Sequence, residues 1–457
     1  VRVTEILTQD QLSQEIVSSM KEYMIAKGIG EERVLLTVDN EDDYTTPFLY
    51  VNVADGLALN LKLPTSKASA HHASMLRKGI KSADYLLINS YALGVWKRPI
   101  SSSLRLFSWA QHTTRDVLKP PSLLAFDSSP PAPLYQGEGM DLVQFEEQLN
   151  KRVNHDVSFG TIEFLIDGDE FFTHLIDSII AAQESIDIRI FIFDNDDYAL
   201  SIADLLKRKA KQVVKVRVLL DGMGQVMGEG KLADDLPAGF KPPASMEKYL
   251  RQNSKIDVRL RPNTWFKADH TKTIIIDKDF FYTGGMNIGR EYRYHWHDMM
   301  MKVDGPIVHQ VLNEFDMAWA HAGPWGDMSY YKNRLLSNKA HHKREGYSLR
   351  ALFTRFNDPQ IYKAQLHAIK KAKKYIYIHN SYISDDTLIY ELIKARKRGV
   401  DVRVIMPIKG NHHIMNANNI VSANTMFRNG VRIFFYPGMS HIKAAVYDGW
   451  LCTGSAN

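Results

Sequence analysis

The sequence of 457 residues contains an internal repeat, and this repeat restricts the fold more than any other feature. Each copy predicts a helix, a strand, a second helix and a second strand, in that order. These are residues 171–182, 185–193, 198–211 and 215–221 in the first copy, and residues 361–372, 375–379, 385–398 and 401–407 in the second. Alternating helices and strands are typical of βαβ units around a largely parallel sheet. The repeat therefore predicts two similar α/β lobes.

Each copy leads to a segment with a histidine, a lysine, an aspartate and, after a turn, two small residues and an asparagine. The first segment contains His270, Lys272, Asp277, Gly284, Gly285 and Asn287, and the second contains His441, Lys443, Asp448, Gly454, Ser455 and Asn457. Because alternate residues of a strand project from the same face, each copy places an imidazole beside an ammonium group. Glycines let a backbone or the oxygens of a ligand approach closely, and the asparagine amide supplies donors. Two segments with such similar spacing do not arise readily by chance.

These residue types suit chemistry at phosphorus if the two copies face one another. Lys272, Lys443, Asn287 and Asn457 would hold the charged oxygens of a phosphodiester in its transition state. One neutral histidine would attack phosphorus, and the other, protonated, would give its proton to the leaving alkoxide. An ordinary histidine pKa of about 6.5 allows both protonation states near neutral pH. Since the lysines supply positive charge, this interpretation requires neither a metal nor another cofactor.

The paired segments resemble the HKD motifs of the phospholipase D superfamily. The chain is most similar to the bacterial cardiolipin synthase and phospholipase D-like branch, from about Gly160 to Asn457. The resemblance is supported by Trp296-His297-Asp298 and by residues 305–308 and 376–382. It implies two lobes, each an α/β/α sandwich with a mixed, largely parallel sheet, and one active site at their interface.

The resemblance also implies a covalent phosphohistidine, with His270 as the nucleophile and His441 as the general acid and base. The strand carries Asp277 and Asp448 away from the phosphate, so we interpret both as framework groups. Asp298 is expected to orient His270 through its far ring nitrogen, and a surface salt bridge is the alternative for this carboxylate.

The sequence departs from the family pattern in three places. Gly285 stands where serine is common, so one hydroxyl donor is missing. The second segment is one residue shorter between Asp448 and Gly454, which predicts a tighter turn. Family members normally continue beyond the position of Asn457, and that continuation includes the carboxylate that orients the second histidine. The second lobe is therefore expected to be truncated at its C-terminal end.

The repeat divides the chain into three predicted parts. Residues 1–156 form an N-terminal α+β unit without an assigned role, residues 157–335 the first lobe and residues 336–457 the second. The first part includes a predicted helix at residues 9–27. It also includes the pair His71–His72, whose side chains would point apart on a helix and so do not predict a metal site.

Composition excludes several classes of protein. With 45% hydrophobic and 24% charged residues, the chain is globular rather than disordered. Its one cysteine, Cys452, permits no intrachain disulfide and no cysteine zinc cluster. No stretch has the 18 or so apolar residues of a membrane span, and no signal peptide is visible. The sequence thus predicts a soluble or peripheral membrane protein and leaves the compartment open.

Three functions remain open at this point. The leading hypothesis is a lipid phosphodiesterase or phosphatidyltransferase, with a phospholipid substrate and a membrane surface as partners. A nuclease with the same site would need a stronger basic groove than the net charge of +5 indicates. A catalytically silent scaffold is disfavoured because both motifs are intact. Aromatic residues at 292–296 and 319–331 and the basic run at 339–344 either contact a lipid interface or belong to the core and a linker. The oligomeric state is left open.

Overall fold

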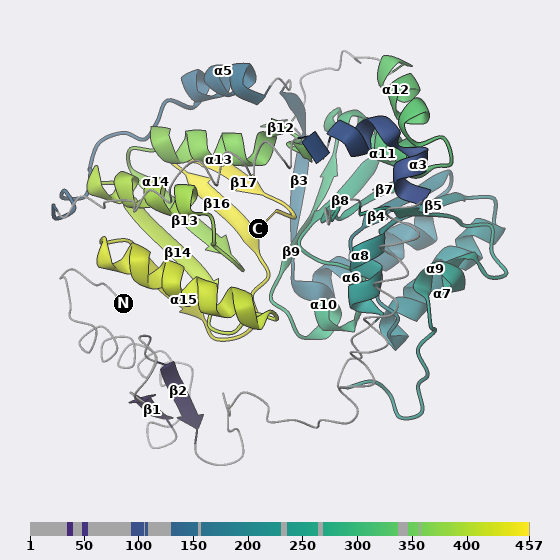
Figure 1. Ribbon diagram of the computed structural model, residues 1–457, viewed down its shortest axis with the longest axis horizontal. Helices are drawn as coiled ribbons and strands as arrows, with labels where there is room; N and C mark the ends of the chain where they lie inside the picture. The colour runs from purple at the N-terminus through teal and green to yellow at the C-terminus, as the bar shows by residue number, and fades with distance from the viewer. Residues whose placement is uncertain are drawn as a thin grey trace.

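The computed structural model describes most of the two predicted lobes and parts of the region before them. The described residues are 34–39, 48–53, 93–104, 106–107, 129–153, 157–229, 235–263, 268–336, 346–355 and 358–456. The predicted helix at residues 9–27, the pair His71–His72, the basic run at 339–344 and Asn457 lie outside them. Two α/β lobes, each built on one sheet, lie side by side (Figure 1).

The first lobe is built on an eight-stranded sheet with the order β10-β3-β9-β8-β7-β4-β5-β6. Its strands are β3 (Ser158–Ile166), β4 (Ser185–Ile190), β5 (Lys215–Asp221), β6 (Asp257–Arg261), β7 (Thr273–Ile276), β8 (Phe280–Gly284), β9 (Met299–Asp304) and β10 (Tyr347–Leu349). Helices α6 (Asp167–Ala181), α7 (Asp197–Lys211) and α9 (Met246–Arg251) pack on one face, and α11 (Ile307–Ala322) packs on the other. Smaller helices are α8 (Gly222–Gly228), α10 (Arg290–Tyr294) and α12 (Gly326–Leu336).

The second lobe is built on a five-stranded sheet with the order β15-β14-β13-β16-β17. Its strands are β13 (Tyr375–Asn380), β14 (Asp401–Pro407), β15 (Arg432–Tyr436), β16 (Lys443–Tyr447) and β17 (Trp450–Thr453). Its helices are α13 (Gln360–Lys371), α14 (Asp386–Lys397) and α15 (His413–Arg428). Two short hairpins, β1 (Val34–Asp39) with β2 (Phe48–Val53) and β11 (Thr354–Arg355) with β12 (Asp358–Pro359), lie outside these sheets.

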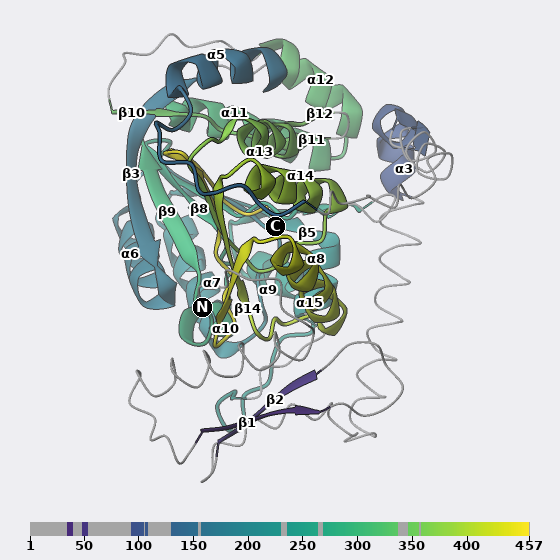
Figure 2. The same ribbon diagram turned by 90° about the vertical axis from the view of Figure 1, so that its left-hand side faces the viewer.

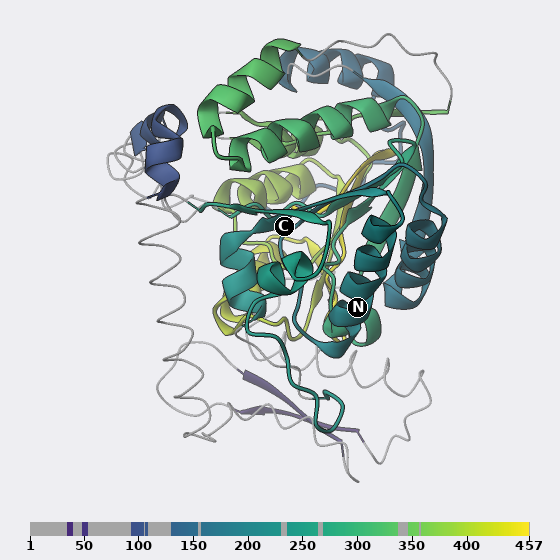
Figure 3. The same cartoon turned by 90° about the vertical axis from the view of Figure 1, so that its right-hand side faces the viewer.

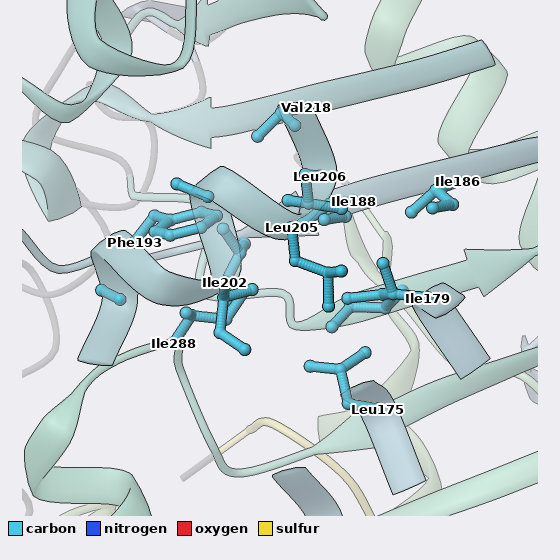
Figure 4. Packing of buried hydrophobic residues seen from close by; sticks show 14 of the residues in the cluster. Leu175, Ile179, Ile186, Ile188, Phe193, Ile202, Leu205, Leu206, Val218 and Ile288 are labelled. Carbon is cyan, nitrogen blue, oxygen red and sulfur yellow. The ribbon is translucent and has the colours of Figure 1, made fainter. Parts of the chain in front are cut away.

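The predicted repeat is confirmed as the succession α6-β4-α7-β5 in the first lobe and α13-β13-α14-β14 in the second. All six residues of β4 are buried, as expected for a strand covered on both faces. Figure 4 shows Ile186 and Ile188 of β4 close to Leu175 and Ile179 of α6. The apolar runs of the sequence thus became central strands because helices cover both of their faces.

Both sheets are mixed, as the sequence predicted, and in the first lobe the parallel pairs are the minority. Strands β4, β5 and β6 pair in parallel, whereas β7, β8, β9, β3 and β10 all pair antiparallel with their neighbours. The turn between β7 and β8 accounts for one of these pairs, since a connection of a few residues can join only antiparallel neighbours. The histidine segment therefore begins a hairpin, as expected from the turn that the sequence predicts after it.

Helix α5 (Leu142–Val153) precedes the first lobe in the chain but packs on the second. Phe145 and Leu149 are buried in the same apolar cluster as Ala364 and Ala368 of α13. In the opposite direction, β10 follows the first lobe and pairs with its strand β3. Each of the two lobes thus includes a segment from outside its own repeat. The division at residues 156 and 336 remains a prediction.

Replacing Phe145 with alanine should destabilise the second lobe by about 3–5 kcal/mol, because the change leaves a cavity in its core. Urea unfolding followed by far-UV circular dichroism measures this effect. Val143→Ala on the same helix is the control, since Val143 is 73% exposed. Equal midpoints for the two variants would show that α5 does not contribute to this core.

Candidate active site

The two histidine segments lie at the interface of the lobes, at equivalent places in the two sheets. His270 and Lys272 directly precede β7, while His441 precedes β16 and Lys443 begins it. Each segment contacts the other lobe: Nδ1 of His270 lies 2.9 Å from the backbone oxygen of Ser455, and the N–H of His441 donates to the carbonyl of His297 at 2.7 Å. After burial, the lysine of the opposite segment is among the groups that lower the pKa of each histidine. The tertiary structure therefore brings together the four side chains that the sequence singled out.

His270 is held by the other lobe. Its Nδ1 lies 2.9 Å from the backbone oxygen of Ser455, so Nδ1–H donates to that carbonyl and Nε2 keeps its lone pair. The ring packs against Phe191, with centroids 4.8 Å apart. Burial, followed by the charge of Lys272, holds the pKa of His270 well below its usual value. The resting state is a neutral imidazole with a free Nε2.

His441 is held by a carboxylate from the first lobe. Its Nδ1 lies 2.7 Å from Oδ2 of Asp298, and its ring packs 5.1 Å from Trp296. Asp298 is fully buried, and this burial raises its pKa to about 7 against the opposing effect of Lys443. Burial also keeps the pKa of His441 well below its usual value. Burial thus disfavours the charged form of both groups.

This contact corrects the expectation that Asp298 orients His270. Asp298 directly precedes β9, at the point where a backbone bridge joins the two lobes. The N–H of His441 donates to the carbonyl of His297 at 2.7 Å, and the N–H of His297 donates to Met439 at 3.0 Å. Alternation along this bridge turns the carboxylate of Asp298 toward His441. Nδ1 of His441 thus takes its carboxylate partner from the first lobe, contrary to the expectation that this partner follows Asn457.

Asp167 fixes the backbone of this bridge and was missed by the sequence analysis. Its Oδ1 accepts from Nδ1 of His297 at 2.8 Å and from the N–H of Asp298 at 3.0 Å, and its own N–H donates to the carbonyl of Asp298 at 2.8 Å. The imidazole of His297 also stacks on Tyr436 of the second lobe, with centroids 4.8 Å apart and planes at 9°. Nothing in local spacing signalled these contacts, because they join segments about 130 residues apart.

The two lysines are buried, with side chains turned back on their own segments. Lys272 is 1% exposed and its Nζ donates to the carbonyl of His270 at 3.0 Å. Lys443 is 4% exposed and donates to the carbonyl of His441 at 2.7 Å and to Oγ of Ser381 at 3.4 Å. Burial lowers the pKa of Lys443 to about 8, and burial together with the charge of Lys443 holds the pKa of Lys272 well below its usual value. Two buried ammonium groups that disfavour each other create a site for an anion.

The amide of Asn287 is mainly engaged within the protein. Its Oδ1 accepts from the N–H of Ile192 at 3.0 Å, and its Nδ2 donates to the hydroxyl of Tyr292 at 2.7 Å. One amide proton remains for a ligand. Gly285 lies so close to Asp298 that a β-carbon there would overlap the carboxylate. The glycine in place of the family's serine is thus required by the tight packing around Asp298.

The two aspartates of the motifs belong to the framework. The carboxylate of Asp277 accepts the backbone N–H groups of Gln183, Glu184 and Ser185 at 2.7–2.8 Å. The carboxylate of Asp448 accepts those of Met140, Lys373, Lys374 and Tyr375. Each aspartate therefore fixes the start of the central strand of its lobe.

A buried ionic cluster next to His270 was also missed. Asp269 accepts from Nε and a terminal nitrogen of Arg189 at 2.8 and 3.1 Å and forms an ion pair with Arg261. These arginines hold the pKa of Asp269 far below its usual value despite burial. In the second lobe the corresponding place is neutral, since Oγ of Ser440 lies 2.6 Å from Nε2 of His379. Arg189, an arginine within a largely apolar strand, was the feature of the sequence that could have indicated this cluster.

The aromatic segments divide between core and surface. Tyr292, Trp296 and Trp319 are buried, whereas Tyr294 and Trp325 are 53% and 69% exposed. Across the described residues, no group of three or more His, Cys, Asp or Glu side chains is arranged to hold a metal ion. Nor is any helix of the described part long and apolar enough to cross a membrane.

Comparison with known proteins adds to this geometry. The family model "Cardiolipin synthase, PLD-like domain" matches residues 175–319 and 366–457, which together make up more than half of the chain. A cardiolipin synthase of Listeria welshimeri is 30% identical over 310 residues, covering 65% of this chain and 62% of that protein. One from Staphylococcus aureus is 27% identical over 336 residues, covering 71% and 66%. The chain thus spans less than two thirds of these relatives.

A solved structure with a partial likeness is that of the phosphatidylserine synthase of Haemophilus influenzae. It is 14% identical and covers 67% of this chain and 80% of its own, with a TM-score of 0.49.

Replacing Gly285 with alanine should displace Asp298 and break its bond to His441. The ¹⁵N shift of His441 Nδ1 measures the loss of this bond in a histidine-labelled protein. Gly438→Ala is the matched control near the site, because a β-carbon at Gly438 would meet its nearest neighbour at an ordinary 3.6 Å. An unchanged Nδ1 shift in Gly285→Ala would contradict the close packing described above.

Proposed function

The chain belongs to the cardiolipin synthase, PLD-like domain family, and from this membership we propose that it transfers the phosphatidyl group of a phospholipid to an alcohol or to water. The observation that carries the proposal is the meeting of two imidazoles and two buried ammonium groups at one interface. A phosphodiester brings the negative charge that this arrangement lacks. The names of the matched relatives favour an alcohol as acceptor.

His270 is the proposed nucleophile. With Nδ1–H engaged by the carbonyl of Ser455, the lone pair of Nε2 is directed away from that contact. Attack by Nε2 forms a nitrogen–phosphorus bond, and the bond from phosphorus to the leaving alcohol breaks with its electron pair on oxygen. A neutral hydrogen-bond partner at Nδ1 suits a nucleophilic histidine, because the imidazole must be uncharged before it attacks. This argument agrees with the role that the family resemblance implies.

His441 is the proposed acid and base. A bound phosphodiester adds negative charge beside it, which raises its pKa again and moves a proton onto the ring. Asp298 stabilises the resulting imidazolium through the bond to Nδ1. Nε2–H then protonates the leaving oxygen, and neutral His441 takes the proton of the acceptor hydroxyl. Attack by that hydroxyl oxygen on phosphorus releases His270.

Lys272 and Lys443 are proposed to hold the phosphoryl oxygens. Each lysine must turn its Nζ from a backbone carbonyl toward the ligand, a short movement for a side chain with four rotatable bonds. The buried position makes each charge more effective than in water. Because these cations compensate the phosphate, we propose that the reaction needs no metal ion. A peripheral position on a membrane follows from a lipid substrate and is part of the same proposal.

His270→Ala and His441→Ala should each lower the turnover of mixed phospholipid vesicles by about 10²- to 10⁴-fold, because each removes one proton-transfer or bond-forming group. Product masses, measured with and without added glycerol, report hydrolysis and transfer. His309→Ala is the control variant, since this histidine lies on α11 away from both motifs. Release of nucleotides from single-stranded DNA with lipid left intact would replace this function by that of a nuclease. Strong inhibition by a chelator would refute the metal-free mechanism.

The kcat/KM of the protein should be highest below about pH 7 and should fall as the pH rises to about 8 and beyond. The pair of Asp298 and His441 acts as the acid only while it carries one proton, and it loses this proton as the pH rises through the raised pKa of Asp298, about 7. As the pH rises through the lowered pKa of Lys443, about 8, one phosphate-binding charge is also lost. In Asp298→Asn the fall near pH 7 should disappear while the fall near pH 8 stays. A fall near pH 7 that survives in this variant would assign the titration to another group.

A further inference from the structure

A short helical segment before the first lobe exposes its apolar face to solvent. It consists of α3 (Leu93–Lys97) and the helical residues 99–104 and 106–107. Trp96, Ile100, Leu104 and Phe107 are 83%, 51%, 47% and 70% exposed. Their spacing of four, four and three residues places them on one face of a helix. A surface helix of a globular protein normally buries such a face, so this orientation requires another explanation.

The opposite, polar face holds the segment to the first lobe. Arg98 is 5% exposed and its Nε donates to the carbonyl of His321 at 2.7 Å. The N–H of Ser101 donates to Oδ2 of Asp327 at 3.0 Å, and its Oγ lies 3.1 Å from Nε2 of His321. Ser102 is buried in the same contact. These polar bonds fix the helix with its apolar side outward.

The exposed apolar area continues onto the start of α12. Gly326 lies so close to Lys97 that a β-carbon there would overlap the carbonyl of Lys97. Trp325 and Met328, on either side of this contact in the chain, are 69% and 72% exposed. We call Trp96, Ile100, Leu104, Phe107, Trp325 and Met328 together the apolar surface. Exposed apolar groups that cluster in this way mark interaction sites.

The apolar surface lies on the side of the molecule that also carries elements next to the catalytic histidines. In Figure 2, α3 projects furthest from the two lobes, on the side of the molecule that carries α8 and α15. Figure 3 shows the same separation of α3 from the lobes. Helix α8 directly follows β5, and α15 follows His412, whose charge acts on the pKa of His441. A planar partner at this surface would therefore face the same side as the proposed reaction.

We propose that the apolar surface docks on an anionic lipid bilayer, with the helical segment lying in the plane of the interface. Tryptophan is favoured at the boundary between hydrocarbon and water, and the surface contains two. Residues 93–107 contain no acidic residue, and Lys97 is exposed next to Trp96 in the chain, which suits lipids with negative head groups. A second copy of the chain fits less well, because a two-fold contact would set the exposed Lys97 near its own counterpart. The proposal deepens the proposed function by assigning the surface that meets the lipid.

Co-sedimentation with vesicles tests this assignment separately from catalysis. The wild-type chain should bind vesicles of phosphatidylcholine with phosphatidylglycerol, and the variant I100S/L104S should bind at least about tenfold more weakly, since it removes two apolar groups without changing charge. The control is I180S/V213S, which alters residues that are 56% and 88% exposed elsewhere. Hydrolysis of bis(4-nitrophenyl) phosphate, a water-soluble diester, should be the same in all three proteins. Loss of that activity throughout would count against the proposed function and leave the docking result intact.

Three results would overturn the docking proposal. The first is equal vesicle binding by I100S/L104S and the control. The second is a wild-type dimer, in sedimentation velocity without lipid, that I100S/L104S converts to monomer, because a second copy would then cover the surface. The third is the same quenching by dibrominated lipid in the wild type and in W96F/W325F, since the tryptophans of the surface would then lie outside the bilayer.

Discussion

The hydrogen bond between Asp298 and His441 joins the two lobes at the point where the proposed chemistry takes place. Burial disfavours the charged form of each group, which is the carboxylate anion of Asp298 and the imidazolium cation of His441. Together they hold a proton that a bound phosphate can draw toward the ring. The backbone bridge at His297 and the carboxylate of Asp167 fix the distance between them. The packing of one lobe against the other therefore also determines where His441, the proposed acid, lies.

The two lobes share a fold but surround their histidines differently. His270 has a neutral partner at Nδ1 and follows Asp269, whose charge is compensated by arginines. His441 has a carboxylate at Nδ1 and follows Ser440, which contacts the neutral side chain of His379. Burial lowers the pKa of His379 to about 4, so no charge is added there. A repeat of two similar sequences thus yields one histidine with a backbone carbonyl at Nδ1 and a second with a carboxylate at Nδ1.

Hydrogen bonds of polar residues also determine the orientation of the apolar surface. In α5, the apolar face is inside the second lobe and contributes to its core. In the segment from α3 to residue 107, bonds from Arg98 and Ser101 hold the polar face instead, and the apolar face is left outside. The two segments therefore present their apolar residues in opposite directions, and the bonds of Arg98 and Ser101 hold the orientation of the second.

The sequence by itself determined the two α/β lobes, their helices and central strands, and the His-Lys pairs that meet at the interface. These follow from local patterns: apolar periodicity decides helices and strands, and the same spacing of two residues couples a histidine with a lysine in each segment. His270, Lys272 and His441 nevertheless lie just before the strands rather than within them. Only the tertiary structure decided which carboxylate serves His441, why Gly285 is a glycine, and that β9 pairs antiparallel with both β8 and β3. Those features depend on contacts between segments far apart in the chain, whose distances and burial no local pattern contains.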